Sequence, residues 1–150
     1  MEVISHNEKA TMDFGAQLAK HLNPGDIVCL FGDLGSGKTT LVKGLAQGLK
    51  VSPRKVSSPT FVLMNVYEGK VPIYHFDLYR IDGKELAGIG YEEFFYGAGI
   101  SVVEWAERLG KETPKEYIDV KLTHKNEHTR LITISAHGKE LNTRLNKLKI

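Results

Sequence analysis

The residues best suited to chemistry in this chain form a glycine-rich segment at positions 32–39, which reads Gly-Asp-Leu-Gly-Ser-Gly-Lys-Thr. The segment matches the pattern G-x-x-x-x-G-K-[ST] at every fixed position, and that pattern is a phosphate-binding loop. Its glycines let backbone N–H groups point at one anion, its lysine reaches the β- and γ-phosphates, and the next hydroxyl holds Mg²⁺. Lys38 and Thr39 occupy those two positions. The segment therefore predicts that the chain binds a nucleoside triphosphate with magnesium.

The segments on either side of this loop are those that a nucleotide site requires. Residues 26–31 form a short, β-rich apolar run, which is typical of a buried parallel strand. After the loop we expect a helix that begins near Lys38 and ends at Gly48 or Leu49. Its apolar residues recur on one face: Leu41, Val42, Leu45, Ala46 and Leu49. This order aims the helix N-terminus at the phosphates, which favours a ligand site over a tight glycine turn that binds nothing.

Hydrolysis of a bound triphosphate needs a carboxylate near the metal and a polar group near the attacking water. Glu104 is one candidate, because it follows the apolar run 100–103. A run of this kind places an acid at the carboxyl end of a strand beside the phosphate-binding loop, although Asp is the usual residue there. The alternative is a surface carboxylate at the end of a strand.

Asp77 is the second candidate, within residues 71–80. Strand alternation sets His75, Asp77 and Tyr79 on one face, opposite an apolar set. Such a pattern fits both a site and an ordinary half-exposed strand. His75 alone is more typical of a structural histidine than of a metal ligand.

Two further features are ambiguous on their own. The loop 57–60 reads Ser-Ser-Pro-Thr, where nucleotide switches often carry a threonine that senses the γ-phosphate, but these residues are also ordinary turn formers. Trp105 is the only tryptophan in the chain. Taken alone, it favours core packing over stacking on a base.

The remaining segments predict an α/β fold. We expect a P-loop NTPase-like core of mainly parallel strands, with flanking helices and added antiparallel hairpins. Strands are predicted at 2–5, 61–67, 71–81, 117–123 and 129–136, the last four as two hairpins. Helices are predicted at about 7–22 with Ser5 or Asn7 as the cap, in part of 84–96, and around Leu141, Leu145 and Leu148, while residues 51–60 are expected to form a loop.

Length and composition indicate one domain of an ordinary soluble protein, covering residues 1–150. The chain is 41% hydrophobic and 25% charged. No apolar stretch approaches the roughly 20 residues of a membrane span, and the first residues show no signal-peptide pattern. The single cysteine, Cys29, lies in the predicted buried strand and is expected to be a small core residue. Together these features predict a cytoplasmic protein without a membrane partner.

The net charge of +2 is too small to argue for nucleic-acid binding. From position 121 onward, however, the sequence contains seven Lys or Arg residues and only two acidic ones. They are Lys121, Lys125, Arg130, Lys139, Arg144, Lys147 and Lys149, with Glu127 and Glu140 as the acids. This basic end fits either a surface for RNA or an acidic partner, or simply a solvated face, which is the commoner case.

Four segments taken together resemble the bacterial TsaE (YjeE) family of small ATPases, which are needed for the threonylcarbamoyladenosine modification of tRNA. They are residues 32–40, Ser-Pro-Thr-Phe at 58–61, His-Phe-Asp-Leu-Tyr-Arg at 75–80, and Glu-Trp at 104–105. The resemblance spans roughly residues 7–136. The phosphate-binding loop occurs in many unrelated proteins, so the H-x-D-x-Y-R block followed by E-W is the more specific part. Ala106 stands where many relatives have proline, and the segment after His137 has no motif that aligns.

The resemblance implies a site for ATP and Mg²⁺ and a role for each matching residue. The residues implied to bind the nucleotide are Asp33, Leu34, Gly35, Ser36, Gly37, Lys38, Thr39, Thr40 and Thr60. Thr60 would lie in a switch-like loop. Lys38, Asp77 and Glu104 would be catalytic, and Thr39 would hold the metal together with the two acids. The resemblance does not divide metal ligation and water orientation between Asp77 and Glu104.

The family also implies partners. These are the TsaD and TsaB proteins, whose complex transfers threonylcarbamoyl to adenosine 37 of tRNAs that read codons beginning with A, so that tRNA is met indirectly. ATP hydrolysis, slow in the isolated protein, would reset or license that transferase between turnovers.

Two other classes of nucleotide protein share the loop. A small metabolite kinase would usually have an arginine-bearing lid, and here Arg80, Arg108, Arg130 and Arg144 are scattered with no lid-like insertion. A regulatory GTPase would need an Asn-Lys-x-Asp motif to read guanine, and the sequence contains none.

Overall fold

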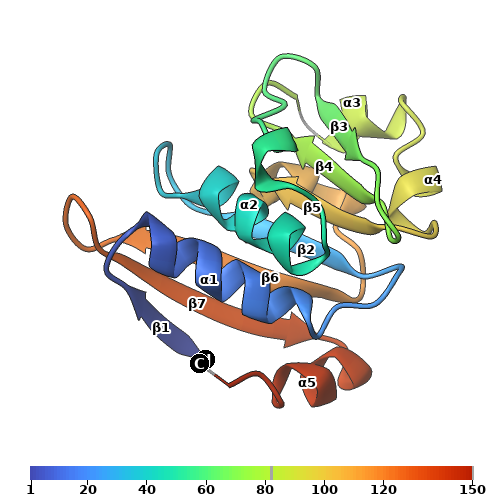
Figure 1. The fold of residues 1–150 in the computed structure, drawn as a ribbon. Helices are drawn as coiled ribbons and strands as arrows, with labels where there is room; N and C mark the ends of the chain where they lie inside the picture. The colour runs from blue at the N-terminus through green and yellow to red at the C-terminus, as the bar shows by residue number, and fades with distance from the viewer. Residues whose placement is uncertain (82, 150) are drawn as a thin grey trace.

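The described residues, 1–81 and 83–149 of this computed structural model, form a seven-stranded sheet with helices on both faces (Figure 1). In sheet order the strands are β1 (Glu2–Ser5), β7 (Arg130–His137), β6 (Tyr117–His124), β2 (Ile27–Phe31), β5 (Ile100–Glu104), β4 (Ile73–Asp77) and β3 (Met64–Tyr67). The four strands from β6 to β4 are parallel neighbours. The hairpins β6–β7 and β3–β4 and the pair β1–β7 add antiparallel strands at the two sides. The predicted α/β fold, with a parallel core and added hairpins, is confirmed.

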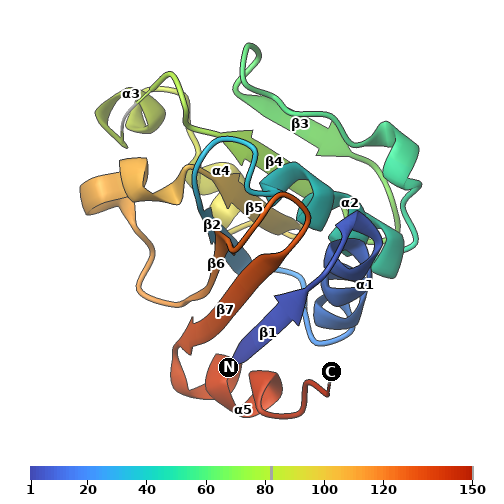
Figure 2. The same cartoon turned by 90° about the vertical axis from the view of Figure 1, so that its left-hand side faces the viewer.

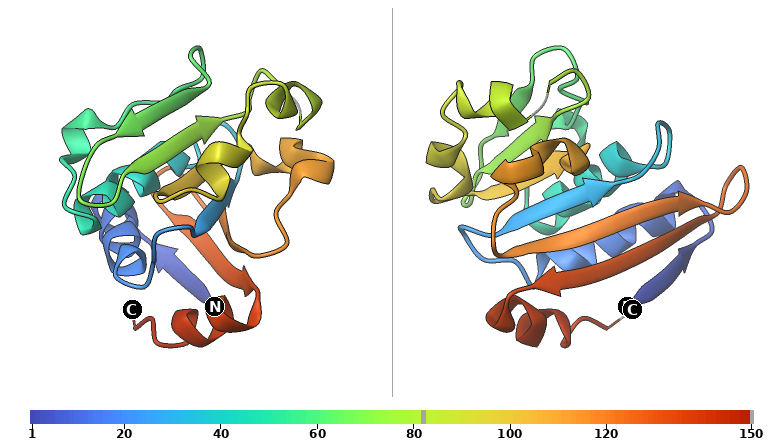
Figure 3. Two further views of the ribbon diagram at one scale, coloured as in Figure 1. Left: turned by 90° about the vertical axis from the view of Figure 1, so that its right-hand side faces the viewer. Right: turned by 180° about the vertical axis from the view of Figure 1, so that it is seen from behind.

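Different helices cover the two faces of the sheet. The core on one face includes residues of α1 (Glu8–Ala19), α2 (Lys38–Gly48) and α5 (Lys139–Leu145). Figure 3 shows the short elements α3 (Gly83–Ala87), α4 (Glu92–Phe95) and the 3-10 segment η2 (Ala106–Glu112) on the other side. A further 3-10 turn, η1 (Pro53–Lys55), follows α2. No helix in the described part of the chain is long and apolar enough to span a membrane.

The central strand β2 is buried as its sequence predicts. Val28 and Leu30 join the core beneath α1 and α2, and Ile27 and Cys29 join the core on the opposite face. This alternation is what a parallel strand covered by helices on both sides requires. Cys29 is a fully buried core residue, and burial raises the pKa of its thiol, so that it is held as the unreactive protonated form.

The first helix is shorter than predicted and has the second of the two proposed caps. Its N-cap is Asn7, whose side-chain oxygen accepts a hydrogen bond from the backbone N–H of Ala10. Ser5 is buried at the end of β1 instead, where its hydroxyl lies 2.7 Å from that of Thr11. The helix ends at Ala19, before the turn at residues 23–25.

The hairpin of β3 and β4 is confirmed, but both of its strands are shorter than the β-rich runs predict. Val62 and Leu63 each donate a backbone hydrogen bond to the carbonyl of Pro59, so the chain turns there and β3 begins only at Met64. Strand β4 ends at Asp77, because a carboxylate oxygen of that residue accepts the backbone N–H of Tyr79 and closes a local turn.

Helices α1 and α2 cross at glycine-lined contacts that leave no room for a side chain. A Cβ atom on Gly44 would lie 2.1 Å from the carbonyl oxygen of Met12, and one on Gly15 would lie 2.6 Å from that of Leu41. Both obstacles are backbone atoms of the opposite helix, which cannot turn away as a side chain can. The crossing fixes the helix that begins at Lys38 against the N-terminal part of the chain.

We expect Gly44→Ala to destabilise the protein, although alanine favours a helix over glycine by about 1 kcal/mol. Separating the two backbones should outweigh that gain and leave a net loss of about 2 kcal/mol. The loss would lower Tm by roughly 4–8 °C in a domain of this size, measured by thermal unfolding. Gln47→Ala, at an exposed position of the same helix, is the control and should change stability by no more than about 0.5 kcal/mol. An unchanged Tm for Gly44→Ala would contradict the tight crossing.

Candidate functional site

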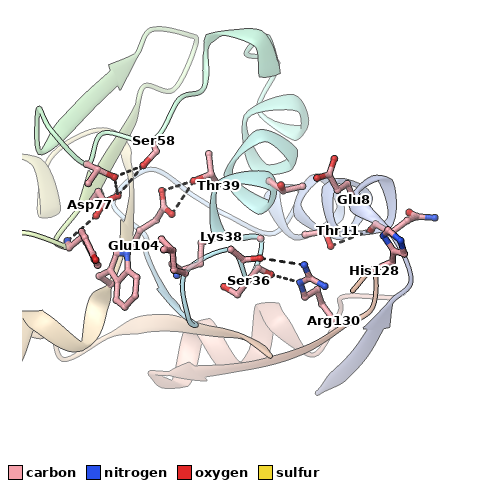
Figure 4. A pocket seen from close by; sticks show the side chains of 18 of the residues that line it. Glu8, Thr11, Ser36, Lys38, Thr39, Ser58, Asp77, Glu104, His128 and Arg130 are labelled. Atoms are coloured by element: carbon pink, nitrogen blue, oxygen red, sulfur yellow. Dashed lines mark hydrogen bonds between the residues drawn. The ribbon is translucent and has the colours of Figure 1, made fainter. Parts of the chain in front are cut away.

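The phosphate-binding loop forms one wall of a cavity of about 830 Å³ at the carboxyl ends of β2, β5 and β4 (Figure 4). Most of the residues expected to bind a nucleotide line it: Leu34, Gly35, Ser36, Gly37, Lys38, Thr39, Thr40 and Thr60. Asp77 and Glu104 line it as well. Asp33 does not; it lies at the exposed start of the loop, where its carbonyl accepts a hydrogen bond from Lys38. A cavity of this size is in the range of small-molecule sites.

The backbone of the loop takes conformations that favour glycine. Gly37 has φ 105° and directly precedes α2, so it turns the chain into the helix. Gly32 has φ 147°, and a Cβ atom there would lie 2.7 Å from the carbonyl oxygen of Leu122 on β6. The glycines at the ends of the motif therefore shape the loop and let it pack against the sheet. The predicted order of strand, loop and helix is confirmed.

Lys38 folds back over its own loop. Its ammonium group donates hydrogen bonds to the carbonyl of Gly32 and, at 3.0 Å, to that of Asp33. It also lies 4.2 Å from the ring centroid of Trp105, a cation–π contact. Burial lowers the pKa of the ammonium below its usual value, and the nearby carboxylates, first among them Glu104, oppose that shift. The lysine thus places a positive charge inside the cavity.

Glu104 lies beside the loop, as its place at the end of a strand predicts. Its carboxylate accepts the hydroxyl hydrogen of Thr39 over distances of 3.1 and 3.3 Å to the two oxygens. The strand register explains this contact: β5 pairs in parallel with β2 and sets Glu104 opposite Leu30, two residues before the loop. Glu104 is only 3% exposed. The alternative of a surface carboxylate is therefore wrong.

Asp77 comes from the next strand and lies at the same level of the sheet. It pairs directly with Glu104 in the register of β4 and β5, and period-two alternation points both side chains to the face that α2 covers. One carboxylate oxygen of Asp77 accepts the hydroxyls of Ser58, at 3.1 Å, and Thr60, at 2.8 Å. Asp77 is 3% exposed, so the alternative that it belongs to an ordinary half-exposed strand is wrong as well. The structure thus brings the two predicted acids together.

The segment 58–63 presents two hydroxyls to the cavity and two apolar side chains to the solvent. Ser58 and Thr60 contact Asp77, whereas Phe61 and Val62 are 81% and 65% exposed. The guanidinium of Arg80 lies 4.3 Å from the ring centroid of Phe61 and covers it in part. Arg80 is therefore a surface residue in contact with this loop.

His75 contacts the Glu104 carboxylate, although His75 itself does not line the cavity. Its Nε2 lies 2.5 Å from Glu104 Oε2, and its Nδ1 lies 2.8 Å from the hydroxyl of Tyr67. Sequence reasoning favoured a structural histidine and gave no signal for this contact. Among the described residues, no group of three or more His, Cys, Asp or Glu side chains forms a metal cage.

Comparison with known proteins gives this arrangement a family. The sequence model described as "Threonylcarbamoyl adenosine biosynthesis protein TsaE" matches residues 5–132. The chain belongs to the TsaE family. It is 40% identical to the "tRNA threonylcarbamoyladenosine biosynthesis protein TsaE" of Nostoc sp. over 134 residues, which cover 86% of this chain and 82% of the relative. The protein of that name in Bacillus subtilis is 38% identical over 133 residues, with 88% and 83% covered.

A solved structure of the family supports the same fold. The crystal structure of Bacillus subtilis YdiB superposes with a TM-score of 0.83 at 31% sequence identity, covering 99% of this chain and 93% of the YdiB chain. The resemblance to the TsaE family that the motifs indicate is thereby confirmed.

In this TsaE protein the tip of the β6–β7 hairpin braces the phosphate-binding loop, which sequence reasoning missed. Figure 2 shows the β6–β7 turn beside the loop that joins β2 to α2. Arg130 donates hydrogen bonds to the carbonyls of Ser36 at 3.0 Å and Gly35 at 3.3 Å (Figure 4), and His124 Nε2 lies 3.0 Å from that of Gly35. The contacts join residues more than 85 positions apart in the sequence. No local motif marks them, because they depend on the pairing of β6 with β2.

Two of the basic residues near the end of the chain have internal partners. Besides Arg130, the guanidinium of Arg144 binds both carboxylate oxygens of Asp26, at 2.6 and 2.9 Å, and the carbonyl of His21. These contacts hold α5 against the turn that precedes β2. The lysines at 121, 125, 139, 147 and 149 are exposed, which both interpretations of the basic end expect.

Trp105 lines the cavity and also packs against the core beneath it. It has a left-handed backbone, with φ 58°, and its ring contacts both Lys38 and Tyr79. Core packing alone, which sequence reasoning favoured, is therefore an incomplete description of this residue.

We expect Arg130→Met to loosen the phosphate-binding loop without unfolding the protein. A hydrogen bond from a charged donor contributes about 1.5–3 kcal/mol, so hydrogen–deuterium exchange at residues 33–37 should accelerate about tenfold. Lys125→Met, at an exposed position of the same hairpin, is the matched control and should leave this exchange unchanged. Equal exchange rates in the two variants would show that the hairpin does not brace the loop.

Proposed function

We propose that this TsaE protein is a single-domain, cytoplasmic ATPase that binds Mg·ATP at residues 32–40. We further propose that it supports the TsaD–TsaB complex in forming threonylcarbamoyladenosine at position 37 of tRNAs that read codons beginning with A. One observation carries the proposal: three separate parts of the chain bring Lys38 and Thr39, Asp77, and Glu104 to the lining of one cavity. The names of the relatives supply the pathway.

The oxygen donors beside Lys38 fit magnesium. The Thr39 hydroxyl and the Glu104 carboxylate lie 3.1 Å apart, and both are hard oxygen ligands. Magnesium commonly takes one or two such ligands and completes its shell with phosphate oxygens and water, so a cage of protein side chains is not needed. Bound there, the ion would neutralise charge on the β- and γ-phosphates. We assign Thr39 and Glu104 as its ligands in the protein.

Asp77 has a different environment, and we assign it a different role. Its carboxylate holds the hydroxyls of Ser58 and Thr60, so it ties the switch-like loop to the cavity. A carboxylate in this place would orient the attacking water, and Thr60 would report on the γ-phosphate. When a nucleotide binds, the Lys38 ammonium would leave the carbonyls of its own loop and donate to phosphate oxygens instead. Its positive charge would then stabilise the negative charge on the phosphoryl group being transferred.

The far end of the cavity is the proposed place for the base and ribose. Residues at the start of α1 and the hairpin tip line it: Asn7, Glu8, Lys9, Thr11, Glu127, His128 and Arg130. It lies on the other side of the phosphate-binding loop from Asp77, which is the direction in which the nucleoside of a bound nucleotide would extend (Figure 4). The preference for adenine follows from the family.

Replacement of Lys38 should mainly lower ADP affinity, whereas replacement of either acid should mainly slow ATP hydrolysis. Lys38→Ala removes the charge that meets the phosphates and should lower ADP affinity at least about 30-fold. Glu104→Gln and Asp77→Asn should slow ATP hydrolysis about 100-fold, while metal-free ADP binds within about threefold of the wild type. Calorimetry and phosphate release measure the two quantities. Loss of ADP affinity in the acid variants to the same extent as in Lys38→Ala would contradict the assigned roles.

The pathway is tested by nucleoside analysis of tRNA from cells depleted of this protein. We expect threonylcarbamoyladenosine to fall, and we expect purified TsaD and TsaB to accelerate the slow ATP hydrolysis of the isolated protein. An unchanged level of threonylcarbamoyladenosine would contradict the proposed role of this protein in that pathway. Stoichiometric transfer of phosphate from ATP to a small metabolite would instead identify the metabolite kinase considered as the alternative.

A further inference from the structure

A row of hydrogen-bonded side chains connects Thr39 of the phosphate-binding loop with Ser57 at the start of the switch-like loop. Thr39 donates to Glu104, Glu104 Oε2 lies 2.5 Å from His75 Nε2, and His75 Nδ1 lies 2.8 Å from the Tyr67 hydroxyl. The Tyr67 hydroxyl in turn lies 3.0 Å from the carbonyl of Ser57. The row crosses β5, β4 and β3, whose register aligns these side chains.

The three middle members of the row are shut off from solvent. The side chain of His75 is 0% exposed and that of Glu104 4%, and Tyr67 is 5% exposed as a residue. A buried carboxylate needs donors, because it has lost the water that would otherwise solvate it. Thr39 supplies one donor and His75 the other. Thr39 approaches both oxygens of Glu104, whereas His75 contacts Oε2, so the imidazole selects one orientation of the carboxylate.

The hydrogens available in the row fix the direction of the contact between His75 and Glu104. Since the Glu104 carboxylate only accepts, His75 Nε2 carries the hydrogen and donates it. At Nδ1 the contact with Tyr67 can run in either direction: the hydroxyl donates to a bare Nδ1, or it accepts from an Nδ1–H and donates to the Ser57 carbonyl. The Ser57 carbonyl has a second donor in the amide of Asn65, at 3.2 Å, and the backbone N–H of Ser57 donates to the Tyr67 oxygen at 3.3 Å. In either case Tyr67 contacts the Nδ1 side of the ring, and Nε2 is left as the donor to Glu104.

We propose that His75 and Tyr67 are positioning residues for the metal site: Tyr67 orients the imidazole of His75, and His75 holds the Glu104 carboxylate in place beside Thr39. The inference rests on the proposed function, because it assigns Glu104 as a ligand of the nucleotide-bound Mg²⁺. Neither residue lines the cavity, so both act through Glu104. Partners that orient a ligating side chain commonly change metal affinity by 10–100-fold when they are removed.

The test measures magnesium binding directly. Isothermal calorimetry gives the affinity of the purified full chain for ADP in EDTA and the affinity of its ADP complex for Mg²⁺. We expect His75→Ala to weaken Mg²⁺ binding at least tenfold and Tyr67→Phe to weaken it several-fold, with metal-free ADP affinity unchanged in both. His75→Gln keeps an N–H donor near the position of Nε2 and should recover most of the Mg²⁺ affinity.

Tyr74→Phe is the matched control, since it removes a hydroxyl from the neighbouring position of β4, where the ring packs against Phe94. It should leave Mg²⁺ affinity as in the wild type. Should His75→Ala fail to fold, Tyr67→Phe decides, because its ring and packing are retained. Wild-type Mg²⁺ affinity in a folded Tyr67→Phe and His75→Ala, or an equal loss of metal-free ADP affinity, would overturn the positioning role. ADP binding that is insensitive to Mg²⁺ in the wild type itself would overturn the proposed metal site and this inference with it.

Discussion

The parallel pairing of β2, β5 and β4 is the constraint on which the site depends. Parallel strands in register end at the same edge of a sheet, so the residues that follow or close them meet there. Leu30 pairs with Glu104, and Glu104 pairs with Asp77. The loop that leaves β2 therefore lies beside two carboxylates that are 65 and 38 residues away from Thr39 in the sequence. Glycine packing between α1 and α2 then fixes the helix that carries Lys38 and Thr39 over this edge.

Much of this could be predicted from the sequence, because the decisive signals are local. A glycine-rich loop of this pattern between an apolar strand and an amphipathic helix is typical of a phosphate-binding site. An acid directly after a buried apolar run must lie at the end of that strand. Strand ends were less predictable, since they depend on competing hydrogen bonds. Asp77 closes β4 by capturing the N–H of Tyr79, and Pro59 delays β3 by accepting from Val62 and Leu63. β propensity carries neither kind of information.

The residues that sequence reasoning missed are those whose role comes from the sheet order. Arg130 reaches the phosphate-binding loop because β6 pairs with β2, and His75 reaches Glu104 because β4 pairs with β5. In a single sequence each looks like an isolated basic or aromatic residue of a strand. The same holds for Trp105, which combines core packing with a contact to Lys38 and therefore fits neither simple interpretation.

The segment 58–63 has one further consequence. Leu63 holds a left-handed backbone, with φ 73°, which is unfavourable for a branched side chain and is sustained by the hydrogen bonds at Pro59. Within this short stretch the hydroxyls that bind Asp77 and the exposed side chains of Phe61 and Val62 belong to the same few consecutive residues. Since Thr60 and Phe61 are consecutive residues, a displacement of the exposed Phe61 side chain would also move the hydroxyl that binds Asp77.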